Sequence, residues 1–145
     1  SSINLGLDIR IPQDYIADET QRLRTYKRIS DADSEEDAAR IRDEVEDRYG
    51  PVPEAVVNLL QFSLLKALAQ RVGVEAIDRR GGALNIKFHP QSQVDPNRLL
   101  EIVNSTAGAQ FTPAGVLRIP LTGLDTPQKL LTYLTELLSP PKVVA

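Results

Sequence analysis

The single histidine of this chain is its first candidate for catalysis. His89 is the only histidine among 145 residues, and cysteine is absent. No serine, cysteine or pair of carboxylates stands at a spacing from His89 that would indicate a catalytic group, so we interpret it as structural or exposed. A small hydrolase that uses His89 stays an alternative, because a triad is defined by geometry. Without cysteine there is no thiol catalysis, thiolate metal site or disulfide bond.

Nucleotide-binding loops and a metal site are the other chemistry to consider. The chain has no G-x-x-x-x-G-K-S/T loop and no G-x-G-x-x-G loop. Its one carboxylate run comprises Glu35, Glu36, Asp37, Asp43, Glu44, Glu46 and Asp47. The first three would open a helix, where carboxylates favour the positive end of the dipole. The others alternate with Arg40, Arg42 and Arg48, whereas a hard cation needs converging oxygens without competing charge. We predict no metal, no cofactor and no catalytic residue here.

Two groups of basic residues are candidates for contact with nucleic acid. They are Arg22, Arg24, Lys27 and Arg28 on one predicted helix, and Arg79 and Arg80 at a predicted hairpin. The net charge is −3, from 17 Lys and Arg against 20 Asp and Glu, which is unfavourable for a module that neutralises phosphates. We interpret both groups as solvated polar surface, and a nucleic-acid-binding accessory module stays the alternative function.

A mixed-sign trio is the best candidate for a binding surface. Glu44, Asp47 and Arg48 are spaced i, i+3 and i+4 on a predicted helix, so the three side chains share one surface. They flank the apolar stripe that the same helix would bury. Such a trio can pair with opposite charges on a partner and fix the register of docking. A solvated face with no partner is the other interpretation of the same pattern.

The N-terminal half must position this trio, and it reads as a strand followed by three helices. Alternation over residues 5–11 predicts a strand, and Asp18 is the expected N-cap of a helix through residue 30. The inward edge of that helix would be Leu23, Tyr26 and Ile29. Residues 34–49 form the second helix, with Ser34 at its start and Gly50 and Pro51 past its end. Residues 53–72 are apolar on nearly all sides, which predicts a buried core helix.

The C-terminal half reads as a repeated hairpin and helix. Strand-like runs at 74–79 and 83–88 flank a Gly-Gly turn, and a helix is expected over 95–105. A second hairpin, 110–120, precedes a last helix over 126–138. Hairpins without β-α-β alternation predict an α+β fold with a small antiparallel sheet. The length fits a single domain, 1–145, with possible subdomains at 1–72 and 73–139. Because the chain lacks an initiator methionine, we expect it to be part of a longer protein.

Three ordered motifs resemble a known family. The run from Asp47 to Pro53, Asp-Arg-Tyr-Gly-Pro-Val-Pro, resembles the signature of the C-terminal (TRCF) domain of bacterial transcription-repair coupling factors (Mfd). Residues 11–16, Ile-Pro-Gln-Asp-Tyr-Ile, and residues 22–29, Arg-Leu-x-x-Tyr-Lys-Arg-Ile, resemble the two segments upstream. The resemblance covers residues 7–65 and is looser beyond Gly73. Tyr49 stands where Phe is frequent, and Glu46 replaces a position that is often apolar.

The resemblance implies a function without chemistry in this domain. The family is a multidomain ATP-dependent DNA translocase that displaces stalled RNA polymerase and recruits UvrA for nucleotide excision repair. Its C-terminal domain would dock on the UvrB-like N-terminal module of the same protein, mask UvrA binding and restrain the motor. The positions used for docking match Glu44, Asp47 and Arg48. ATP and Mg²⁺ would be bound elsewhere in the parent protein, which is expected in the cytoplasm and without contact to a membrane.

Overall fold

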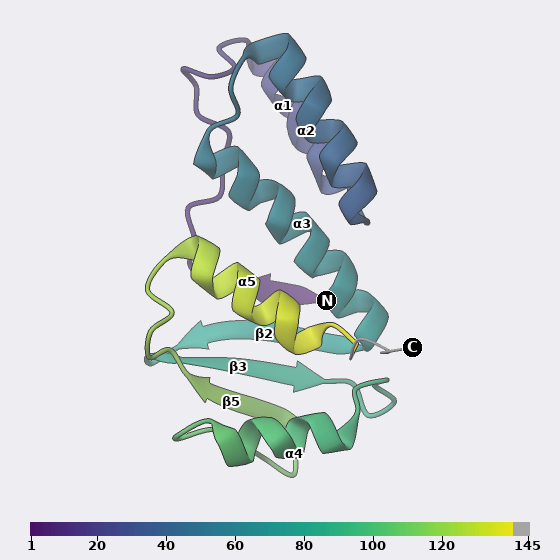
Figure 1. Ribbon diagram of the computed structural model, residues 1–145, viewed down its shortest axis with the longest axis vertical. Coiled ribbons are helices and arrows are strands. Elements are labelled where there is room, and N and C mark those ends of the chain that lie inside the picture. The colour runs from purple at the N-terminus through teal and green to yellow at the C-terminus, as the bar shows by residue number, and fades with distance from the viewer. Residues whose placement is uncertain (141–145) are drawn as a thin grey trace. The chain divides into compact units, whose positions relative to one another are not determined.

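The computed structural model describes residues 1–140, which fold as two compact units (Figure 1). One unit is Asp8–Ala67, and the other combines Ser1–Leu7 with the chain from Leu68 onward. The sequence suggested a division at residue 72, whereas the structure divides the chain inside the third helix. The first seven residues group with the C-terminal half because their strand pairs with a strand there.

Three helices build the unit Asp8–Ala67. They are α1 (Glu19–Ser30), α2 (Glu35–Tyr49) and the first part of α3 (Glu54–Val72). Asp18 begins α1 by accepting a hydrogen bond from the Gln21 amide at 2.9 Å, and Ser34 begins α2 in the same way with the Asp37 amide at 3.1 Å. The core of this unit is formed by Ile11, Ile16, Ile29, Ala32, Ala38, Ile41, Val45, Val56 and Leu60.

Two expectations for this half are wrong. Residues 5–11 form no strand, although their burial does alternate from Leu5 to Ile11. The backbone takes a left-handed conformation at Gly6, whose φ is +65°, and the first strand is Ser2–Asn4 instead. Leu23 does not lie on the inward edge of α1, since 61% of it is exposed. Thr25 is buried in its place, and its hydroxyl donates to the Gln21 carbonyl at 2.8 Å.

A five-stranded sheet organises the other unit. The strands are β1 (Ser2–Asn4), β2 (Val74–Arg80), β3 (Ala83–Phe88), β4 (Gln110–Phe111) and β5 (Val116–Pro120), in the order β1-β2-β3-β5-β4. The two predicted hairpins are present and join through β3 and β5. β1 adds a parallel edge strand that the sequence did not predict in this sheet, so the sheet is mixed.

Two amphipathic helices accompany the sheet, α4 (Pro96–Ser105) and α5 (Pro127–Leu138). Each has proline in its first turn and an N-cap, Asp95 or Thr126, as the sequence predicted. Alternate strand residues, such as Leu84 and Ile86 of β3, are fully buried. Leucines of α5 are buried as well, which gives this unit its own core. Five helices and a five-stranded sheet confirm the predicted α+β class.

Candidate docking site

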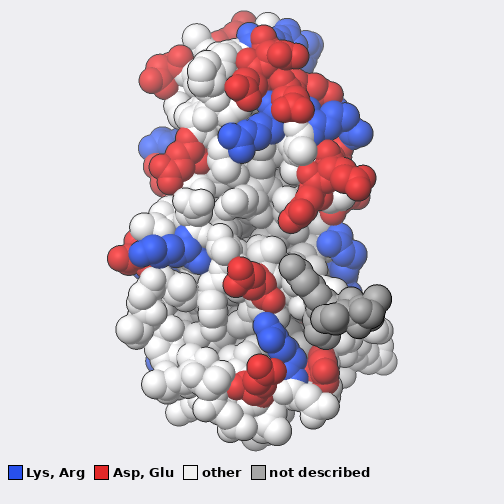
Figure 2. Space-filling view, in the orientation of Figure 1, with Lys and Arg blue, Asp and Glu red and all other residues white. Residues whose placement is uncertain are grey.

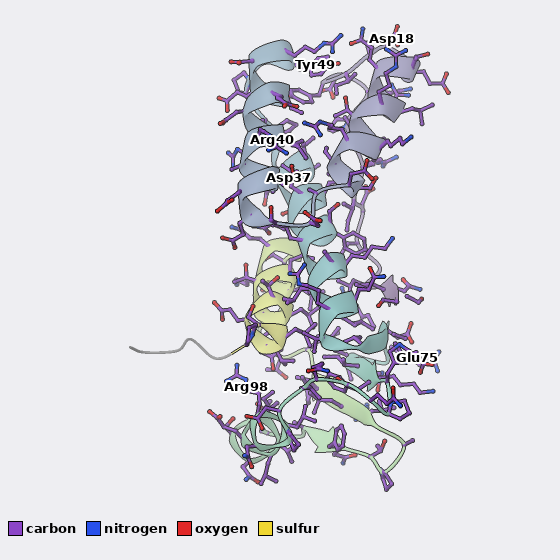
Figure 3. All side chains as sticks on the ribbon, turned by 90° about the vertical axis from the view of Figure 1, so that its right-hand side faces the viewer. Asp18, Asp37, Arg40, Tyr49, Glu75 and Arg98 are labelled. Carbon is purple, nitrogen blue, oxygen red and sulfur yellow. The ribbon has the colours of Figure 1, made fainter. Side chains whose placement is uncertain are left out.

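The first two helices pack side by side in opposite directions. The Tyr49 hydroxyl near the end of α2 donates to Gln21 Oε1 near the start of α1 at 2.7 Å. In Figure 3, Asp18 and Tyr49 are accordingly labelled at the same end of the pair. Arg28, late in α1, contacts Glu44, which lies more than a turn before Tyr49. This antiparallel register decides which charges of the two helices meet.

Tyrosines hold the ends of these helices in place. The Tyr15 hydroxyl donates to the Gly50 carbonyl at 2.8 Å, and its ring lies 6.0 Å from the Tyr49 ring at 59°. The Tyr26 hydroxyl accepts a hydrogen bond from the Ile11 amide. Burial, with the charge of Glu46 and the nearby Tyr49, raises the pKa of Tyr15 above its ordinary value. Residues of all three sequence motifs therefore meet in one network that fixes the position of α2.

The predicted trio lies on the exposed surface of α2. Glu44, Asp47 and Arg48 are all exposed, so the structure brings them together on one helix as the spacing indicated. Figure 2 shows acidic and basic side chains interleaved over α2. Mixed charge at this density is suited to reversible contact with a partner, because it specifies register and costs little to expose to water when the partner leaves.

The three members of the trio differ in what they already contact. Glu44 accepts from Arg28 of α1, with Nη2 at 3.0 Å from Oε1 and 3.1 Å from Oε2, and Nε at 3.3 Å from Oε2. The guanidinium carbon of Arg48 lies 5.5 Å from the centre of the Tyr49 ring, within range of a cation–π contact. Asp47 forms no ion pair with any residue between 1 and 140. Asp47 is thus the member of the trio most available to a partner.

Arg28 is the residue of this face that the sequence did not assign to it. The sequence grouped Arg28 with the other cations of its helix as a candidate for phosphate contact. Its hydrogen bond with Glu44, followed by the charge of Glu44, raises its pKa above the ordinary value. The family motif at residues 22–29 contains Arg28 and was the available signal in the sequence. Residue spacing within one helix, however, does not predict the register between α1 and α2.

Of the other cations of α1, one is engaged within the unit and two are exposed. Arg22 donates from Nη1 to the backbone carbonyls of Ile16 at 3.0 Å and Ala17 at 3.3 Å. Arg24 and Lys27 are exposed. Because Arg22 and Arg28 both have partners in the fold, the basic helix is less available to phosphate than its composition suggested. Arg79 and Arg80, at the end of β2, are exposed.

His89 has a structural position after β3. Its backbone amide donates to the Gly73 carbonyl at 2.8 Å, and its own carbonyl accepts from the Ser92 amide at 3.0 Å. Ser92 Oγ and the Gln93 amide both donate to the Val72 carbonyl, at 2.7 and 3.0 Å. The loop that begins at His89 therefore satisfies carbonyl groups at the end of α3. The part of the chain that the structure describes holds no cluster of three His, Cys, Asp or Glu suited to a metal.

No helix within residues 1–140 combines the length and the apolar character that a membrane span requires.

Comparison with known proteins points to one family. The TRCF domain family matches residues 5–99. The transcription-repair-coupling factor of Haemophilus influenzae is 33% identical over 103 residues, or 71% of this chain and 9% of that protein. Its counterpart in Rickettsia bellii is 30% identical over 112 residues, or 77% of this chain and 10% of that protein. The chain therefore spans about a tenth of the length of these curated relatives.

A solved structure supports the fold independently. The crystal structure of a C-terminal domain of transcription-repair coupling factor matches with a TM-score of 0.81 and 22% sequence identity. The match covers 94% of this chain and 90% of the other. At this identity the likeness concerns the fold, which is the α+β arrangement described above.

Proposed function

Because the chain belongs to the TRCF domain family, we propose that it is a non-catalytic regulatory domain of a transcription-repair coupling factor. Docked on the UvrB-like N-terminal module of the same protein, it masks the surface that binds UvrA and restrains the ATP-dependent DNA translocase. The observation that carries this proposal is the exposed trio Glu44, Asp47 and Arg48, held on α2 at positions that match those expected from the family signature.

The charge pattern of the trio suits a contact that must open and close. Asp47 offers a carboxylate that has no ion pair within residues 1–140, and Arg48 offers a cation beside an aromatic ring. Tethering in one chain raises the effective concentration of the two modules to the order of millimolar, so individually weak contacts are sufficient. A partner that binds only the undocked state, as UvrA would, then shifts the population toward the open form.

The test is made in the full-length parent protein. Replacing Glu44, Asp47 and Arg48 together with alanine should raise both the basal ATPase rate and the affinity for UvrA. Removing one member of a desolvated charge pair costs about 2–5 kcal/mol, which is enough to open a closed state of modest stability. The matched control is Glu75→Ala with Lys87→Ala. It removes an ion pair of the sheet unit whose length, 3.0 Å, equals that of the pair between Glu44 and Arg28. The proposal fails if the triple variant changes neither readout.

A nucleic-acid-binding accessory module is the alternative function. The exposed Arg79 and Arg80 favour it, since they lie together at the β2–β3 hairpin. This alternative requires that the 145-residue chain bind DNA with an affinity that falls steeply with salt, and that Arg79→Glu with Arg80→Glu abolish the binding. Absence of binding at low salt would remove the alternative while leaving the docking proposal untouched.

The remaining parts of the proposal concern the parent protein. ATP and Mg²⁺ serve its motor and not this domain, and RNA polymerase and DNA are contacted through the rest of the chain. The cytoplasm, where transcription and repair take place in bacteria, is the proposed location. Family membership and the resemblance of the motifs support these parts of the proposal.

A further inference from the structure

One face of the five-stranded sheet is polar and open to water. Successive residues of a strand point to opposite faces of a sheet. The core face holds the fully buried residues Ile77, Ile86 and Leu117. Figure 3 shows α4 and α5 on one side of the sheet, while the labelled Glu75 projects on the other side. Antiparallel strands commonly leave one face of a sheet solvated, and we call this second surface the open sheet face.

A polar row crosses the open sheet face from one edge of the sheet to the other. The register of the five strands places one residue of each strand in this row. In order across the sheet, its members are Asn4, Asp78, Asn85, Arg118 and Gln110. Asn4, Arg118 and Gln110 are exposed, and the other two are half-buried. The row is therefore accessible to a partner along its whole length.

The two charges of the row are opposite in sign and symmetric about its middle residue. Asp78 lies one strand to one side of Asn85, and Arg118 lies one strand to the other side. Because neighbouring strands are about 4.8 Å apart, the two charged positions are roughly 10 Å apart. Neither Asp78 nor Arg118 forms an ion pair with any residue of the described range 1–140. A row with this order of charges is complementary to its own reverse.

We propose that the open sheet face is the contact surface of a weak homodimer, so that its occupant is a second copy of this chain. The two-fold axis would run along β3 at Asn85, between two sheets stacked face to face. Reversal of the row about this axis places Arg118 of each copy opposite Asp78 of the other, and Asn4 opposite Gln110. A two-fold contact forms each of these pairs twice. The inference goes beyond the proposed docking function and uses the other unit of the chain.

The neighbouring row is compatible with the same axis. In this row Ala76 and Val116 lie on either side of Lys87, so reversal brings two apolar side chains together. Lys87 itself belongs to β3 and would approach Lys87 of the other copy. Its ion pair with Glu75, at 3.0 Å, offsets that charge within each copy. The second row therefore adds apolar contact without opposing the pairing of the first.

The size of the face predicts a weak dimer with a defined register. Five strands spaced by about 4.8 Å, each of about five residues at about 3.3 Å, give roughly 400 Å² for each copy. This is about half of the roughly 800 Å² per partner of a standard interface. Stacked sheets cross at about 30°, which shifts the charged positions by about 2–3 Å, within the reach of an arginine side chain. The two ion pairs would thus fix the register more than they determine the affinity.

Charge reversal in the 145-residue chain tests the proposal. Sedimentation equilibrium at increasing protein concentration measures the association. The wild type should shift toward a dimer as its concentration rises. Asp78→Arg leaves two cations in the row and Arg118→Asp leaves two anions, so each variant alone should associate at least about tenfold more weakly than the wild type.

Combining the two reversals separates loss of contact from damage to the fold. An equimolar mixture of the Asp78→Arg and Arg118→Asp variants should form a heterodimer about as tightly as the wild type forms its dimer, because opposite charges meet again at both positions. The double variant should associate with itself in the same way and should not pair with the wild type. Variants that had merely lost their fold would show neither recovery.

Arg79→Asp is the matched control. Arg79 is exposed and makes the same change of charge, but it pairs with Leu84 and so lies on the opposite face of the sheet. This variant should associate like the wild type. The proposal is overturned if the wild type stays monomeric at every concentration, if the single reversals associate as the wild type does, or if their mixture does not recover. None of these results bears on docking through α2, which the triple alanine variant tests separately.

Discussion

Gly50 is the residue on which the turn from α2 to α3 depends. Its φ is 93° and its ψ is −170°, a region of backbone space that is essentially restricted to glycine. Its carbonyl accepts the Tyr15 hydroxyl, and Pro51 follows directly. The glycine of the signature is therefore explained by backbone conformation, and the tyrosine of the upstream motif by a bond to that backbone.

Gly50→Ala should lower the free energy of unfolding by about 1–3 kcal/mol. No heavy atom lies within 4 Å of the position of the added Cβ, so the cost would come from the backbone and not from a clash. Gly81→Ala is the control with equally open surroundings and a φ of 58°, a left-handed value that other residues adopt at less cost. Urea unfolding of the two variants should show the larger loss at Gly50; equal losses would contradict this account.

Glu75 gives the sheet unit a defined response to acid. Its hydrogen bond to Lys87, followed by the charge of Lys87, lowers the pKa of Glu75 below the ordinary 4.5. A lowered folded pKa contributes stability above the unfolded value, and that contribution is lost as pH falls through the folded pKa. Glu75→Gln should therefore be less stable than the wild type at neutral pH, with a difference that shrinks below about pH 4.5. Urea unfolding over a pH series measures this, and in a Lys87→Gln background the difference should disappear at every pH.

At the scale of elements, the helix ends were predictable from the sequence, but the side of α1 that is buried was not. Ser34, Gly50 and Pro51 marked the bounds of α2 because caps act locally. The inward edge of α1 depended on a polar residue. Thr25 is buried because its hydroxyl is satisfied by a carbonyl one turn earlier, and hydropathy gives no sign of such a bond.

The same limit applies to the candidate site. Helical spacing was sufficient to place Glu44, Asp47 and Arg48 on one surface, because all three belong to α2. The contact of Arg28 with Glu44 could not be predicted in this way, because it depends on the register between two helices, which tertiary packing sets. The parallel strand β1 was missed for a related reason, since its partner β2 lies about seventy residues further along the chain.

The orientation of α1 can be tested by paired substitutions. Leu23→Gln should change the free energy of unfolding by less than about 0.5 kcal/mol, because this side chain is largely exposed. Ile29→Ala should cost about 2–5 kcal/mol, because Ile29 is fully buried in the core of its unit. Chemical unfolding of the 145-residue chain compares the two. A large loss of stability on Leu23→Gln would instead support the inward position of Leu23 that the hydropathy pattern suggested.

At the scale of the whole molecule, the chain order and the structural units do not coincide. The first strand of the sequence completes the sheet, and the docking face lies in the segment between that strand and the rest of the sheet unit. The Ser1 hydroxyl donates to the Val74 carbonyl at 2.8 Å, which joins the N-terminal segment to β2. A change at the N-terminus should therefore act on the sheet and leave α1 and α2 unaffected.

Removal of residues 1–4 tests whether the two units respond separately. Three residue pairs between β1 and β2 would be lost. At about 0.2–1 kcal/mol for each pair, the sheet unit should lose roughly 0.6–3 kcal/mol. Amide hydrogen exchange should accelerate in the 76–78 segment of β2 at the N–H groups that point toward β1, while exchange in α1 and α2 keeps its rate. Equal acceleration in α1 and α2 would mean that the units open together, and the docking face would then be sensitive to the integrity of the sheet.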